Sequence, residues 1–128
     1  MTSPHRVFVI DDSEIARELI TLILDSHGFE VEASHTPFDL DTALKTFQPA
    51  LILLDLRMPG LTEARLPEVV QQYRAACNAH VVLHSAHDRE EVARIVQNAG
   101  ADGSIEKTDD DALFVERVSE WVSRAVVA

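Results

Sequence analysis

Carboxylate side chains follow two apolar runs in this sequence, at points where a strand would end. Asp11 and Asp12 come directly after the run Val7–Ile10, and Asp55 comes directly after the run Ala50–Leu54. Three carboxylates within a few ångströms of one another would repel by roughly 3–4 kcal/mol per pair at an effective dielectric constant of about 20. Such a group must keep a proton or bind a cation. Oxygen ligands suit Mg²⁺, so we expect a magnesium site and prefer it to a raised pKa.

A hydroxyl and an amine complete this set of reactive side chains. Ser85 follows the apolar run 79–83, and Lys107 follows the short run 103–106. A lysine is a mobile point charge suited to a phosphoryl group, and a serine hydroxyl that turns toward such a group can donate to it. Together with a metal ion and the acceptor carboxylate of Asp55, these are the parts needed to transfer a phosphoryl group onto Asp55.

These side chains meet only if the apolar runs form one parallel sheet. Five short runs are typical of strands, at residues 7–10, 29–33, 50–54, 79–83 and 103–106, and the run 29–33, which alternates weakly, should be a less buried strand. Five helical segments alternate with them: Ile15, Leu19, Leu22 and Ile23 on one face; Leu40, Ala43, Leu44 and Phe47; residues 66–76; Val92, Ile95, Val96 and Ala99; and Phe114, Val118, Trp121 and Ala125. Because each connection is a helix, we expect an α/β doubly wound sheet, all parallel, with the strand carboxyl ends at one edge.

The chain as a whole is acidic, with a globular composition. Its 128 residues predict one domain over residues 1–128. The formal net charge of -11 would repel phosphate backbones and anionic lipid, so we expect no direct nucleic-acid binding and no membrane insertion. The single cysteine, Cys77, fits a reducing compartment, and the first apolar run is too short for a signal peptide. We therefore expect a cytoplasmic protein.

The sequence resembles the receiver domain of bacterial two-component response regulators, in particular the single-domain regulators of the chemotaxis type. The resemblance covers nearly the whole chain and rests on four segments: Val9-Ile10-Asp11-Asp12-Ser13, Leu53-Leu54-Asp55-Leu56-Arg57-Met58-Pro59-Gly60, His84-Ser85-Ala86, and Gly100-Ala101-Asp102-Gly103 followed by Lys107. It implies a flavodoxin-like sheet with strand order 2-1-3-4-5 and helices on both faces.

The resemblance also implies a role for each acidic residue. Asp55 would be the phosphoacceptor of a phosphorelay, modified by a histidine kinase, a phosphotransfer protein or a small phosphodonor. Asp12 and Asp55 would bind Mg²⁺ directly, and Asp11 would bind it mostly through water. The backbone carbonyl of Arg57 would be a further metal ligand.

The remaining implied roles concern switching. Lys107 would contact the phosphoryl oxygens, and Ser85 would rotate toward them. The protein would be a phosphorylation-dependent signalling switch and not an enzyme with a diffusible substrate, catalysing only its own phosphorylation from small donors and its own dephosphorylation. It would pass the signal to a downstream effector protein or domain, and the face made by the fourth helix, fifth strand and fifth helix would be available for a homodimer.

Several positions depart from the family pattern or vary within it. Ser104 stands three places before the lysine, where an aromatic residue usually turns inward on phosphorylation, and Thr108 stands where a proline usually follows the lysine. Arg57 and His87 occupy variable positions beside the predicted pocket, and a solvated surface charge explains Arg57 equally well. These departures keep a second hypothesis open, a pseudo-receiver interaction module that works without phosphate.

Other functional classes fit the residues less well. A phosphatase with an Asp-x-Asp nucleophile loop would need a second acid where Arg57 stands. A nucleotide-binding enzyme would need glycines in the first strand-to-helix turn, which has two aspartates instead. A zinc site built from His80, His84 and His87 lacks a cysteine or a firm fourth ligand.

Overall fold

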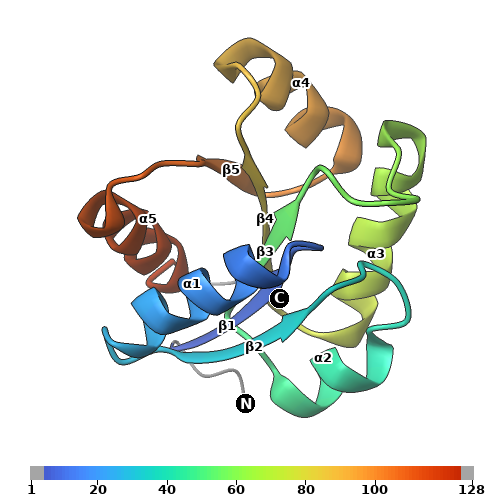
Figure 1. Ribbon diagram of the computed structural model, residues 1–128. Coiled ribbons are helices and arrows are strands. Elements are labelled where there is room, and N and C mark those ends of the chain that lie inside the picture. The colour runs from blue at the N-terminus through green and yellow to red at the C-terminus, as the bar shows by residue number, and fades with distance from the viewer. Residues whose placement is uncertain (1–4, 125–128) are drawn as a thin grey trace.

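The computed structural model describes residues 5–124, which form a central sheet covered by helices on both faces (Figure 1). In chain order the elements are β1 (Arg6–Ile10), α1 (Glu14–Asp25), β2 (Glu30–Ser34), α2 (Asp41–Phe47), β3 (Leu51–Asp55), the 3-10 turn η1 (Glu63–Arg65), α3 (Leu66–Ala76), β4 (His80–Ser85), α4 (Arg89–Ala99), β5 (Gly103–Glu106) and α5 (Asp111–Val122). Among residues 5–124, no helix has both the length and the apolar character needed to cross a bilayer.

The strands run parallel in the order β2-β1-β3-β4-β5, as predicted. Register brings the strand ends together: Ile10 lies opposite Leu54, and Asp55 lies opposite His84. Strand β3 lies at the centre of the sheet, and all five of its residues are buried between the helical layers. This explains why its sequence does not alternate between apolar and polar residues. The edge strand β2 has no buried residue, as expected from the weak apolar alternation of its sequence.

The two faces of the sheet hold separate apolar cores. Leu51 and Leu53 of β3 pack toward α1 and α5, while Ile52 and Leu54 pack toward α2, α3 and α4. This division follows from the strand repeat, in which successive side chains point to opposite faces. Figure 1 shows α1 and α5 together on one side of the sheet.

Local sequence signals fix where the helices begin. Pro67 lies in the first turn of α3, which spans the predicted residues 66–76. Side chains cap three other helices: Ser13 accepts from the backbone N–H of Ala16 at α1, Asp88 caps α4, and Asp110 caps α5. The last residue of the predicted α5 stripe, Ala125, lies outside the described residues.

The predicted apolar face of α1 is wrong in part, although the helix itself is confirmed. Ile15, Leu19 and Leu22 are 78%, 53% and 66% exposed, whereas Ile20 and Leu24 are buried against the sheet. Helix α1 is apolar on two sides, and spacing alone does not say which side a sheet will cover. The protein therefore presents a stripe of three large apolar side chains to solvent, which we call the α1 stripe (Ile15, Leu19, Leu22).

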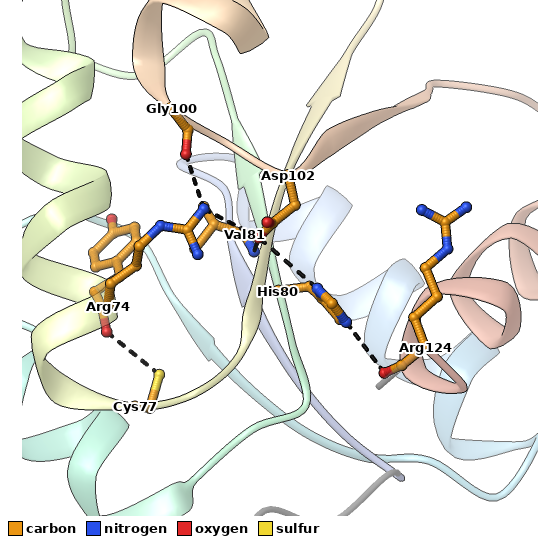
Figure 2. Close-up of polar contacts among 8 residues, drawn as sticks. Arg74, Cys77, His80, Val81, Gly100, Asp102 and Arg124 are labelled. Atoms are coloured by element: carbon orange, nitrogen blue, oxygen red, sulfur yellow. Dashed lines mark hydrogen bonds and ion pairs between the residues drawn. The ribbon is translucent and has the colours of Figure 1, made fainter. Parts of the chain in front are cut away.

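At the amino end of β4, a polar cluster fastens α3 and α5 to the sheet (Figure 2). The Asp102 carboxylate accepts a hydrogen bond from the Val81 backbone N–H at 2.8 Å and from the Arg74 guanidinium at 3.2 Å. The His80 ring lies 3.9 Å from the same carboxylate and 3.2 Å from the carbonyl oxygen of Arg124, beyond the end of α5. One acid thus collects donors from several elements.

Candidate functional site

Asp55 ends the central strand, so β1 and β4 on either side both bring groups to it. Its side chain is 5% exposed. The Arg57 backbone N–H donates to Asp55 Oδ1 at 3.1 Å, which fixes the carboxylate against the following loop. Lys107 Nζ lies 3.3 Å from the same oxygen, although 52 residues separate the two in sequence. The predicted pairing of acid and lysine is present.

Asp11 and Asp12 lie beside Asp55, as the strand order predicts. One carboxylate oxygen from each of the three acids falls within 4.8 Å of the others. Asp11 is buried and Asp12 exposed. Burial raises the pKa of Asp11 above its usual value, and the neighbouring charge of Asp55 raises it further. The donor set is therefore all oxygen, excessively negative and partly open to solvent, which fits a hydrated Mg²⁺.

The start of α1 holds Asp11 in place. The Ser13 backbone N–H donates to Asp11 Oδ1 at 2.9 Å, and the Arg17 guanidinium donates to the Asp11 carbonyl oxygen at 2.7 Å. Both the carboxylate and the backbone carbonyl of Asp11 are therefore held by residues of the β1–α1 junction and α1. Helix capping explains the role of Ser13 here, and neither acid caps α1 with its side chain.

Lys107 reaches Asp55 because the pairing of β4 with β5 continues past the last residue of β5. The Lys107 backbone N–H donates to the Ser85 carbonyl oxygen at 2.9 Å. This contact carries Lys107 to the same edge as the acids. The peptide bond between Lys107 and Thr108 is trans, like every described peptide bond.

Ser85 is at the predicted strand end, but its hydroxyl is engaged elsewhere. Ser85 Oγ lies 2.6 Å from Nδ1 of His87 and accepts from the His87 backbone N–H at 2.9 Å. The side chain of Arg57 is exposed, which agrees with a solvated surface charge. The structure thus gathers the acids and Lys107 into one site and keeps the serine hydroxyl on its own loop.

Sequence reasoning did not assign His84 to the site. The residue is 7% exposed, and the centre of its ring lies 5.5 Å from the centre of the Phe114 ring of α5. Burial lowers the pKa of His84 to about 4, and the charge of Lys107 acts in the same direction. Strand register was the missing signal, since pairing β3 with β4 puts this histidine opposite Asp55. In residues 5–124 only the three aspartates form a group that could hold a metal, so the zinc alternative has no support.

An open groove of about 400 Å³ leads from this site between α1 and α5. Asp11 and Lys107 line its polar part, and Leu19, Ile20 and Phe114 line its apolar part. Leu19 also belongs to the α1 stripe, so the groove and that exposed surface are continuous.

Several known proteins are similar to this chain. A family model described as the response regulator receiver domain matches residues 7–119. The DNA-binding response regulator MtrA of Mycobacterium tuberculosis is 28% identical over 123 residues, covering 96% of this chain and 53% of that protein, so this chain spans about half its length. The chemotaxis protein CheY of Halobacterium salinarum is 24% identical over 115 residues, covering 90% of this chain and 94% of that protein.

Solved structures give the same result. A signal receiver domain of a response regulator from Bermanella marisrubri superposes with a TM-score of 0.77 at 28% identity, covering 93% of this chain and 98% of the other.

Proposed function

Because this chain belongs to the response regulator receiver domain family, a family of regulatory domains, we propose that it is a phosphorylation-dependent signalling switch. It accepts a phosphoryl group on Asp55 from a histidine kinase or phosphotransfer protein, in a Mg²⁺-dependent reaction in the cytoplasm. The observation that carries this proposal is the buried Asp55 carboxylate, with Lys107 Nζ at 3.3 Å and two further carboxylates within 4.8 Å.

The aspartates would hold the metal ion. Asp12 and Asp55 are proposed as direct ligands, Asp11 as a ligand through water, and the Arg57 carbonyl as a further oxygen. Mg²⁺ when bound would supply positive charge next to the transferred group. Burial and, to a smaller extent, the charge of Asp55 raise the pKa of Asp11, so a nearby cation would favour its charged form, which supports this assignment.

The protein's own residues would carry the transfer itself. A carboxylate oxygen of Asp55 attacks phosphorus; the new O–P bond forms as the P–N bond to the donor imidazole breaks, and that electron pair returns to nitrogen. Lys107 Nζ, which now contacts Asp55 Oδ1, would then contact the phosphoryl oxygens. Attack by water on phosphorus later releases inorganic phosphate and restores Asp55.

The surface beside the site supports a protein as the phosphoryl donor. The α1 stripe is continuous with the groove that opens on Asp11 and Lys107. An apolar helix of a donor laid along this surface would bring its phosphohistidine toward Asp55 while covering side chains that are otherwise exposed. Signal output would then follow through altered contacts with a downstream effector.

Incubation with Mg²⁺ and acetyl phosphate tests the proposal. Intact-mass spectrometry should show one added phosphoryl group on the unmodified protein and none on Asp55→Asn. Asp25→Asn, at the exposed end of α1, is the matched control and should be modified like the unmodified protein. Labelling of Asp55→Asn to the same extent would overturn the assignment.

A second candidate is an interaction module that works without phosphate. The Ser85 hydroxyl bound to its own loop favours it, because this is the group expected to meet a phosphoryl oxygen. In that case Asp55→Asn would bind the downstream partner as tightly as the unmodified protein does, with or without acetyl phosphate.

A further inference from the structure

The hydroxyl of Ser85 has a single proton and two competing uses. In the structure Oγ accepts from the His87 backbone N–H at 2.9 Å and lies 2.6 Å from Nδ1 of the same residue. With the ring proton on Nε2, Nδ1 is an acceptor, so the hydroxyl proton is donated to His87. That proton cannot be donated to a phosphoryl oxygen on Asp55 at the same time.

Ser85 is well placed for the second use. It directly follows His84, which lies opposite Asp55 in the sheet, and its carbonyl oxygen accepts from the backbone N–H of Lys107. Rotation about the Ser85 Cα–Cβ bond would redirect the hydroxyl without moving the strand. The backbone is held, and only the hydroxyl needs to change partner.

The imidazole of His87 has space beside it. A small cavity of about 40 Å³ is lined by Ser85 and His87, by Arg89 and Val92 at the start of α4, and by Ser104, Ile105 and Glu106 of β5. This is room for water but not for a whole ring without adjustment of the lining. The short side chain of Ser104 leaves this hollow where a larger residue would fill it.

His87 is also connected to α4. The next residue, Asp88, caps that helix by accepting from the backbone N–H groups of Glu90 and Glu91 at 2.9 Å and 3.2 Å. On the same side, Arg94 of α4 forms two 3.2 Å hydrogen bonds to Glu63 of η1. His87 therefore lies in the short loop between β4 and α4, so a displacement of its ring would be felt at the start of α4.

We propose that His87 is a positioning residue that holds the Ser85 hydroxyl away from Asp55 and is released when that hydroxyl turns to a phosphoryl group. The released ring moves against the Ser104 side of the cavity and changes the surface at the start of α4. This inference rests on the proposed function, since it needs Asp55 to be modified.

Imidazole ¹⁵N spectra of the full chain with Mg²⁺, before and after addition of beryllofluoride, test the release directly. The Nδ1 resonance of His87 should shift on beryllofluoride binding, and the ring of His27, exposed after the end of α1, should not. In Ser85→Ala, the His87 resonances should already differ from those of the unmodified protein and should not change further on binding.

Affinity measurements test the competition between the two uses. His87→Ala should bind beryllofluoride roughly fivefold more tightly, because the competing hydrogen bond is gone. His87→Asn keeps an acceptor near the position of Nδ1 and should bind nearly like the unmodified protein. In the Ser85→Ala background, His87→Ala should have no effect on affinity, whereas a purely structural role would give the same effect in both backgrounds.

The outcomes separate the two proposals. Bound beryllofluoride with shifted Asp55 and Lys107 resonances but an unchanged His87 ring would overturn this inference and leave the proposed function standing. Failure of the unmodified protein to bind beryllofluoride at all would overturn both.

Discussion

The acidic side chains near the two ends of β4 differ in how fully they are paired. At the amino end, the single Asp102 carboxylate accepts from the Val81 backbone N–H and the Arg74 guanidinium and faces the His80 ring, so one acid has several partners (Figure 2). At the carboxyl end, three carboxylates lie close together, and Lys107 contacts one of them, Asp55. The first arrangement ties elements together, whereas the second is incomplete without a cation.

The two histidines of β4 show the same contrast within one strand. His80 meets the Asp102 carboxylate, the carbonyl oxygen of Arg124 and the edge of the Trp121 ring, at 5.5 Å between ring centres. His84, four residues on, is buried beside the Lys107 amine and the Phe114 ring. The same side-chain type thus has two roles on one strand. His80 links β4 to the end of α5, whereas His84 is buried next to the acidic site.

The largest expected effect is on the pH dependence of stability through His84. Its pKa is about 4 in the folded protein and 6.5 when unfolded, so the unfolded state binds the extra proton between these values. Stability is fully present above pH 6.5 and falls by about 3 kcal/mol as the pH drops to about 4. In urea unfolding, the unfolding free energy of His84→Val should fall less between pH 6.5 and pH 4 than that of the unmodified protein. An equally steep fall in the variant would contradict the assignment.

Removing the acid at the amino end should have the next largest effect. Asp102→Ala leaves the buried Val81 N–H without its side-chain acceptor and Arg74 without its ion pair. We expect a loss of about 2 kcal/mol in unfolding free energy, mostly from the backbone group because the ion pair is partly exposed. Glu30→Ala, which breaks an exposed pair with Arg6, is the control and should change stability by less than about 0.5 kcal/mol.

Removing an acid at the carboxyl end should have the opposite sign and a smaller size. Because the folded pKa of Asp11 is raised, its charged form disfavours folding, and this cost appears as the pH rises from 3.8 through the raised pKa. Asp11→Asn should therefore stabilise the metal-free protein at neutral pH, by less than the loss expected for Asp102→Ala.

Thermal melts with and without Mg²⁺ measure this prediction. Excess Mg²⁺ should raise the melting temperature of the unmodified protein more than that of Asp11→Asn, because the cation offsets the repulsion only where the charge is present. Equal shifts of the melting temperature in the two proteins would show that Asp11 does not contribute to the metal site.

Sequence alone predicted those parts of the molecule that depend on chain-local signals and parallel topology. The unbroken apolar run of β3 predicted a buried central strand, and Pro67 marked the first turn of α3. Parallel strands then required Asp55 and Lys107 to share an edge, and the structure places them in contact.

The remaining features depend on distances that a sequence does not contain. Two apolar sides of α1 compete for the sheet, and the choice between Leu19 and Ile20 follows from helix packing. The surroundings of His84 depend on strand register. The contact between Ser85 and His87 depends on the path of a short loop, which residue types alone do not specify.

The α1 stripe has a consequence for the free protein. When no partner covers Ile15, Leu19 and Leu22, two copies could meet through these side chains, but each carries a formal charge of -11. Mutual repulsion at low ionic strength opposes that encounter, and added salt shortens its range to about 10 Å at 0.1 M. Self-association through the α1 stripe should thus increase with ionic strength, because the net negative charge opposes it at low salt.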